Sequence, residues 1–252
     1  MGVNALREQI SEVLLTLEGE LQSFSAITVA ESLRHLAQLV ESFPTHEGSA
    51  KLATLREGSA VTGVLTNAET AVTLSDGIAH LHDHESVPEA WSIDQARSFK
   101  KLIDATVSRH EATLTVDRSS AISLDSRLRD AVSKAVSNIP KSIGTVIGEL
   151  TRYNGAGASK FAGLLQEGTQ KIIDLGLGEN LWQDVIQNMH QRVEIAGLVT
   201  RHPETNQIEK ILARSIEELP EKGSPISGLG IWQDVDFRGQ SPEEIVRHLR
   251  DG

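Results

Sequence analysis

The sequence predicts an α+β protein made of four successive parts. Helical periodicity covers residues 1–45, mixed helical and alternating patterns cover 46–140, and strand-like alternation dominates 141–220. A linker rich in Gly, Ser and Pro leads to a capped helix in 221–252. We therefore expect an N-terminal helical hairpin, a small α+β unit, a five-stranded β-barrel and a C-terminal tail helix.

Composition restricts the class of protein. The chain has 252 residues, a net charge of −11, 39% hydrophobic residues and no cysteine. Without cysteine there are no disulfides, thiolate nucleophiles or cysteine zinc ligands. An acidic chain is repelled by phosphate backbones unless its cations gather on one face. We find neither the pattern of a signal peptide nor an apolar run of bilayer length. We expect a cytoplasmic protein with no membrane partner and no cofactor.

Two amphipathic helices are predicted at the N-terminus. The first spans 3–21 and the second spans 28–43, ending at Pro44. Apolar residues recur at helical spacing in the first segment, at Leu6, Ile10, Val13, Leu14, Leu17 and Leu21. A short connection would make the pair a helical hairpin.

The middle part alternates between strand and helix patterns. Runs at 52–66 and 71–82 read as strands of one hairpin, with turn residues between them at Asn67–Thr70. A helix is predicted over 92–107, with Ser92 as its cap. A second hairpin turns at Asp117–Ser120, and another helix follows and ends at Pro140.

A histidine cluster lies at the end of the second of these runs. His80, His82 and His84 alternate, with Asp83 and Glu85 beside them. If the strand continues through them, the three imidazoles share one face. Three histidines facing one ion would suit zinc or another divalent metal. The alternative interpretation is a solvated strand end.

The barrel is predicted from the order of its elements. Strands at 143–153, 160–165 and 170–175 are followed by a helix at 179–189 and two more strands. The fourth strand alternates cleanly as V-x-I-x-G-x-V, through Val193, Ile195, Gly197 and Val199. This order and this ending resemble the oligonucleotide/oligosaccharide-binding (OB) barrel. An SH3-like barrel and an open sheet remain alternatives.

The predicted barrel could bind single-stranded nucleic acid on its second and third strands. Barrels of this kind use aromatic stacking and basic residues there. The residues available for this role are Arg152, Tyr153, Lys160, Phe161 and Lys171. Between Ser142 and Pro220, however, seven Lys and Arg face ten Asp and Glu. This charge balance disfavours nucleic acid as the partner.

The C-terminal tail is the segment that we expect to bind a protein. Ser241 is an N-cap, Pro242 occupies the first helical position and Glu244 completes a capping box. A helix this short is not stable alone, so it must dock on its own chain or on a partner. The predicted contact residues are Trp232, Val235, Phe237, Ile245, Val246, Leu249 and Arg250.

The tail also carries a resemblance. Residues 241–252 match S-P-E-E-x-x-R-x-L-R-[DN]-G, and with the barrel this resembles bacterial proteins that have an OB-like domain and a short docking tail. The resemblance implies an antitoxin or accessory partner of a toxin nuclease, such as a PIN-type nuclease. This chain is longer than a typical antitoxin and shows no recognisable DNA-binding head.

The sequence predicts a protein that is not an enzyme. We find no G-x-S-x-G, P-loop, dinucleotide fingerprint or H-E-x-x-H pattern. We expect an antitoxin-like or accessory interaction module that binds and controls a toxin or defence nuclease; a second copy of the chain is the alternative protein partner. The alternative is a single-stranded nucleic-acid-binding protein.

Overall fold

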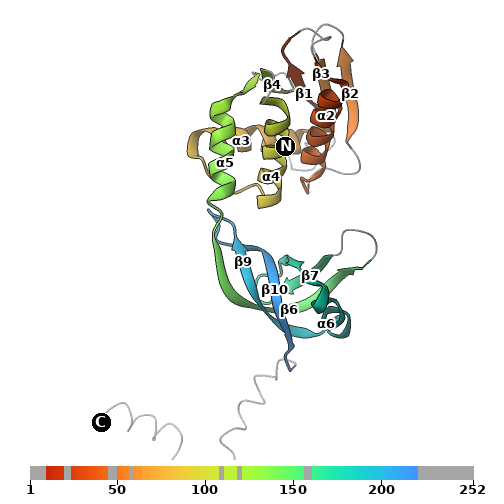
Figure 1. The fold of residues 1–252 in the computed structure, drawn as a ribbon, viewed down its shortest axis with the longest axis vertical. Coiled ribbons are helices and arrows are strands. Elements are labelled where there is room, and N and C mark those ends of the chain that lie inside the picture. Colours follow the sequence, from red (N-terminus) through yellow and green to blue (C-terminus); the bar gives the residue numbers. More distant parts are fainter. Residues whose placement is uncertain are drawn as a thin grey trace, which may run out of the picture.

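The computed structural model describes residues 10–19, 24–44, 50–56, 60–107, 111–117, 121–155 and 161–220. These residues form two units, an N-terminal sheet covered by helices and a β-barrel (Figure 1). The chain passes from one to the other between the last helix of the first unit and the first strand of the barrel. Among the described residues, no helix is both long and apolar enough to cross a membrane.

The N-terminal unit contains one five-stranded antiparallel sheet in the order β2-β3-β1-β4-β5. Its strands are β1 (Ile10–Leu17), β2 (Lys51–Arg56), β3 (Ala60–Asn67), β4 (Ala112–Val116) and β5 (Ile122–Leu124). Its helices are α2 (Ala26–Glu41), α3 (Ala68–His84), α4 (Ile93–Val107) and α5 (Ser126–Ser137).

The predicted N-terminal helical hairpin is wrong, and the predicted fold class is corrected accordingly. The segment expected to be its first helix contains β1, the central strand of the sheet, paired with β3 and β4. Burial along β1 alternates, with Val13, Leu15 and Leu17 inward. The helix α2 packs into the same hydrophobic core as β1, so the two elements belong to the sheet unit.

The predicted strand at 71–82 is also wrong, because this run lies within the helix α3. Asn67 caps the helix, and its side chain accepts a hydrogen bond of 2.8 Å from the backbone N–H of Thr70. Leu74, Ile78 and Leu81 are fully buried at helical spacing. The turn residues between the two runs therefore begin a helix, and β2 forms its hairpin with β3.

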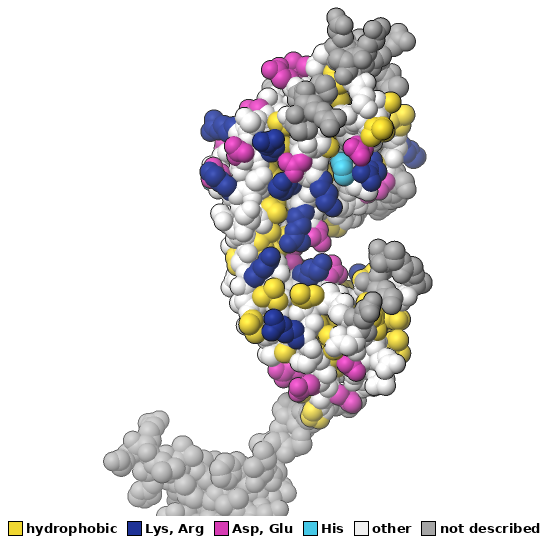
Figure 2. Space-filling view, in the orientation of Figure 1, with side chains coloured by type: hydrophobic (Ala, Val, Ile, Leu, Met, Phe, Trp, Pro, Cys, Tyr) yellow, Lys and Arg dark blue, Asp and Glu magenta, His cyan; other side chains and the backbone are white. Residues whose placement is uncertain are grey.

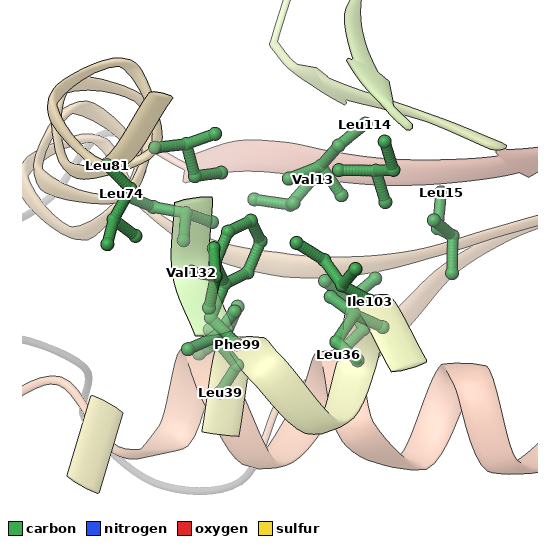
Figure 3. Packing of buried hydrophobic residues seen from close by; sticks show 14 of the residues in the cluster. Val13, Leu15, Leu36, Leu39, Leu74, Leu81, Phe99, Ile103, Leu114 and Val132 are labelled. Atoms are coloured by element: carbon green, nitrogen blue, oxygen red, sulfur yellow. The ribbon is translucent and has the colours of Figure 1, made fainter. Parts of the chain in front are cut away.

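The core of the N-terminal unit lies between the sheet and the helices (Figure 3). Trp91 packs edge-on against Phe43 and Phe99, with ring centroids 5.6 and 5.7 Å apart. Its Nε1–H donates a hydrogen bond of 3.0 Å to the carbonyl of Thr73. A Cβ at Gly77 would lie 2.1 Å from that nitrogen, so only glycine leaves room for the indole. The loop between α3 and α4 is thereby fixed in place.

The second unit is a barrel of β6 (Lys141–Asn154), β7 (Phe161–Gln166), β8 (Ile172–Gly176), β9 (Arg192–Arg201) and β10 (Ile208–Glu218). The strands pair around a ring in the order β10-β8-β7-β6-β9. The parallel β8–β10 ladder joins only three residue pairs, so the ring is weakest at that seam. A short helical segment, η2 (Glu179–Leu181) with α6 (Trp182–Gln187), links β8 to β9.

The strands expected at 143–153, 160–165 and 170–175 agree in position with β6, β7 and β8. The predicted tail helix lies outside the described residues. The corrected fold is an α+β chain with two five-stranded β units, of which the first begins with a strand.

Candidate interaction face

The predicted histidine cluster lies at the C-terminal end of α3, and the helix separates its members. His80 and His84 stand one turn apart, with ring centroids 4.6 Å apart. His82 lies on another side of the helix and contacts Asp83 at 2.8 Å. The prediction that all three share a strand face is therefore wrong. Within the described ranges, no three His, Asp or Glu side chains are placed to hold a metal ion.

The residues predicted to bind nucleic acid do not form one platform. Tyr153 and Phe161 lie where β6 meets the start of β7, and the Tyr153 ring lies 5.7 Å from that of Trp182. Lys171 lies just before β8, near the far end of β7, and its Nζ donates to Gln207 at 3.2 Å. About 13 Å of strand separates the two places. The fifth candidate, Lys160, lies outside the described residues, while Arg152 lies beside the aromatic pair on β6.

The residues predicted to bind a partner through the tail also lie outside the described residues. They are Trp232, Val235, Phe237, Ile245, Val246, Leu249 and Arg250. Two other surfaces are formed by described residues of the two β units. The first is the junction at which the two units contact each other, and the second lies on the outside of the barrel.

The junction is formed by the β9–β10 turn of the barrel and the α3–α4 loop. His202 is 2% exposed, and its Nε2 lies 3.1 Å from the Pro88 carbonyl and 3.0 Å from that of Trp91. Its Nδ1 accepts hydrogen bonds from the backbone N–H groups of Glu204 and Thr205. These partners require the tautomer that carries hydrogen on Nε2. One imidazole thus satisfies groups from both units.

Two glutamates strengthen the same junction. Glu209 accepts a 2.9 Å hydrogen bond from the backbone N–H of Ile93, at the start of α4. A carboxylate at this position satisfies a free helix N–H and complements the helix dipole. Glu204 accepts from Ser86 at 2.8 Å and lies 2.8 Å from the Nε2 of His80. His80 is therefore part of the junction.

Electrostatics at Glu204 agree with this geometry. Burial raises the pKa of its carboxyl, but the hydrogen bond from Ser86 and the attraction of His80 outweigh burial. The net pKa lies below the ordinary value of 4.5. Nearby, a cavity of about 100 Å³ is lined by three acids and two bases, Asp94, Asp174, Glu209, Arg97 and Lys210, besides Ser92, Ile93 and Thr200. The chain's own charges thus surround the junction in mixed signs.

The second surface lies on the outer side of three adjacent barrel strands. Strand register places Leu212 opposite Leu198, and Leu198 opposite Ile143. Ile143 is 76% exposed and Leu212 is 54% exposed. In the next row of the same face, Thr200 pairs with both Lys210 and Lys141. We name this surface the β6–β9–β10 face and define it by Lys141, Ile143, Leu198, Lys210, Leu212 and Arg214.

Cations flank the apolar row of this face, and the exposed acid Asp174 on β8 lies opposite Lys210. Figure 2 shows Lys and Arg side chains in a column that runs from α4 onto the barrel, with hydrophobic side chains among them on the barrel. Lys210 and Arg214 alternate with Leu212 along β10, and all three are exposed. In the N-terminal unit, burial and then the Arg34 charge lower the pKa of His35, and Lys101 adds to this effect. An acidic chain therefore presents a basic side.

Sequence reasoning missed this face, although a signal was present. The patterns K-x-I at 141–143 and K-x-L-x-R at 210–214 place alternate residues on one side of each strand. The side of a strand that faces the barrel core would not carry lysine or arginine among its aliphatic residues, so these patterns indicate the outer side. Only the register between β6, β9 and β10 shows that the two patterns are adjacent.

The fold and the face define a class of protein, a two-unit α+β chain with an exposed aliphatic row between cations. No protein-family model matches the chain, and no curated protein sequence matches it.

Proposed function

We propose that this chain is a non-enzymatic interaction protein that binds a protein partner through its β6–β9–β10 face. The observation that carries the proposal is the row Ile143–Leu198–Leu212, in which Ile143 and Leu212 are exposed and Leu198 is half-buried, with cations beside it. Burying aliphatic side chains on association is favourable by about 25 cal/mol per Å² of apolar area. Cations at the rim of such a row steer and orient an oppositely charged partner.

The chemistry of the face restricts the partner. A complementary surface has an apolar centre and an acidic rim. If the partner is a toxin or defence nuclease, as the tail resemblance implies, the face would contact a surface other than the basic groove that holds nucleic acid. A cytoplasmic location is part of this proposal, and it is supported by the absence of cysteine from the chain.

A second candidate function is single-stranded nucleic-acid binding, and the basic column favours it. Phosphates would be attracted by Lys141, Lys210 and Arg214. The centre of the face, however, is aliphatic, and leucine and isoleucine do not provide the aromatic stacking that such proteins use. The geometry therefore supports a protein partner better than nucleic acid.

The proposal is tested by partner capture with the tagged full-length chain. Ile143→Ser/Leu212→Ser removes the centre of the face, and Val72→Ser/Ile186→Ser is the matched control. Val72 on α3 and Ile186 on α6 are 57% and 52% exposed, comparable with Leu212. We expect the face variant to lose a protein that the control variant retains. Equal retention by both variants would contradict the proposal.

The nucleic-acid alternative has its own measurement. A labelled single-stranded oligonucleotide is titrated with the full chain at low salt and then at rising salt. Retention that falls with salt and with Lys141→Glu/Lys210→Glu would support nucleic acid. Absence of retention at low salt would rule this second function out.

A further inference from the structure

We propose that the β6–β9–β10 face is covered in the free protein by the chain's own segment Ile231–Phe237, which a partner must displace. This inference rests on the proposed function, because it names what regulates the same face. The segment that covers the face belongs to the same molecule. A second copy and an empty face are outcomes that would overturn it.

The face has the properties of a surface that requires a cover. Ile143 and Leu212 are exposed, and their register neighbour Leu198 joins them into one apolar row. On β8, Gly176 lies opposite Leu212 and has no side chain that would cover the edge of the row. A Cβ at this position would lie 3.2 Å from the Leu212 Cδ1. Contiguous exposed apolar surface usually marks a binding site.

The segment Ile231–Phe237 matches this face in chemistry. It has the sequence IWQDVDF, with two aspartates and neither Lys nor Arg. Its large apolar side chains, Trp232, Val235 and Phe237, suit an aliphatic row. Its carboxylates suit the exposed cations Lys141 and Arg214, which flank the row.

The chain is long enough for this contact within one molecule. The last described residue is Pro220, whose carbonyl accepts a 3.0 Å hydrogen bond from Arg192 at the end of the barrel. Leu212 lies eight residues earlier, about 26 Å back along an extended strand. The ten residues 221–230 can span up to about 33 Å when extended. The segment can therefore reach the row.

Tethering makes even a weak contact effective. A short flexible linker gives an effective concentration on the order of 1 mM. If the free segment bound with a Kd on the order of 0.1 mM, the covered state would exceed the open state about ten-fold. A partner that needs the open face would then bind about ten-fold more weakly than without the cover.

The test uses the absence of cysteine from the chain, because a single label can be introduced. Gln233→Cys in the full-length protein carries a nitroxide, and methyl NMR signals report which side chains lie near it. We expect broadening at Ile143, Leu198 and Leu212, unchanged on ten-fold dilution. Val72 and Ile186, exposed on other elements, serve as internal controls.

Two outcomes of the label experiment would overturn the inference. One is broadening at the face no stronger than at the control methyls, and the other is broadening that disappears on dilution, which shows contact between copies. Adding Trp232→Ser/Phe237→Ser to the labelled chain should abolish the effect, whereas Val246→Ser/Leu249→Ser should leave it. Loss in both variants, or in neither, would count against Ile231–Phe237 as the cover.

Partner capture separates this inference from the proposed function. Trp232→Ser/Phe237→Ser should increase partner retention about ten-fold, and Ile143→Ser/Leu212→Ser should abolish it. If the face variant loses the partner while the labelled chain shows no broadening at the face, only the cover is wrong. If broadening is present but the face variant retains the partner, only the proposed function is wrong.

Discussion

The barrel has two contact surfaces of opposite character. At the junction, His202 is buried and its ring nitrogens are used by backbone groups from both units. On the β6–β9–β10 face, Ile143 and Leu212 are exposed beside the cations Lys141 and Lys210. Both surfaces involve the β9–β10 hairpin: its turn contributes to the junction, and the outer side of its strands contributes to the face.

The difference shows which polar groups hold the chain together and which remain available. A buried polar group that loses its hydrogen-bond partner lowers the free energy of unfolding, so the junction residues are needed for stability. Exposed aliphatic and basic side chains contribute little to folding and can be used for binding. Substitutions at the junction should therefore change stability, whereas substitutions on the face should change association.

The largest effect is expected for His202→Ala. It removes the group that bridges the Pro88 and Trp91 carbonyls to the β9–β10 turn, which leaves buried polar groups unsatisfied. We expect the free energy of unfolding to fall by about 2–3 kcal/mol. Denaturant unfolding measures this change, and weaker coupling of the two units should separate their transitions.

Two variants serve as controls for this prediction. His190→Ala changes an exposed histidine of the same barrel and should stay within about 0.5 kcal/mol of the unsubstituted protein. His202→Gln can still donate to the two carbonyls, so it should lose less stability than His202→Ala. Equal stability of His202→Ala and His190→Ala would show that the junction does not hold the units together.

A smaller loss is expected for Glu209→Ala. The carboxylate accepts from the first N–H of α4, and this contact crosses the junction. Removing a group of this kind from a helix start lowers stability by about 1 kcal/mol. The control Glu217→Ala changes an exposed acid on the same strand and should be near neutral. Thermal unfolding that ranks Glu217→Ala as the more damaging variant would refute the role given to Glu209.

A third effect depends on pH and involves Glu204. Its folded-state pKa lies below 4.5, so the ionised carboxylate stabilises the fold at pH values above 4.5. This contribution is lost as pH falls through the folded-state pKa. The side chain is partly exposed, so the contribution is less than about 1 kcal/mol. The stability difference between the unsubstituted protein and Glu204→Gln should therefore be present at pH 7 and shrink below pH 4.5; a constant difference would argue against it.

Sequence patterns predicted the barrel strands better than the N-terminal unit. Alternation in β9 is clean because its inward residues fill the barrel core. In β1, residues Ile10, Val13, Leu14 and Leu17 fit a helix, whereas Val13, Leu15 and Leu17 fit a strand. A central strand with apolar residues on both sides satisfies both periods, so pairing with β3 and β4 decides its structure.

The other failures have equally local causes. Asn67 fits a turn by residue type, but its side chain caps α3, and Leu74, Ile78 and Leu81 have the spacing of a helix. The junction and the face were not predictable in the same way. Each depends on residues far apart in the chain, such as His202 with Trp91 and Ile143 with Leu198, which only the folded register brings together.

The sharpest contrast with the junction is expected for Ile143→Ser/Leu212→Ser. Both side chains are exposed and lie outside the barrel core. A ten-fold preference for the covered state stabilises the fold by about 1.4 kcal/mol, so the free energy of unfolding should change by no more than about 1.5 kcal/mol in total. Association should nevertheless be lost, because the two residues form the centre of the apolar row. Denaturant unfolding and partner capture on the same preparation measure both quantities. A loss of stability as large as that of His202→Ala would mean that the row already packs against part of its own chain strongly enough to belong to the fold, and the distinction between the two surfaces would then fail.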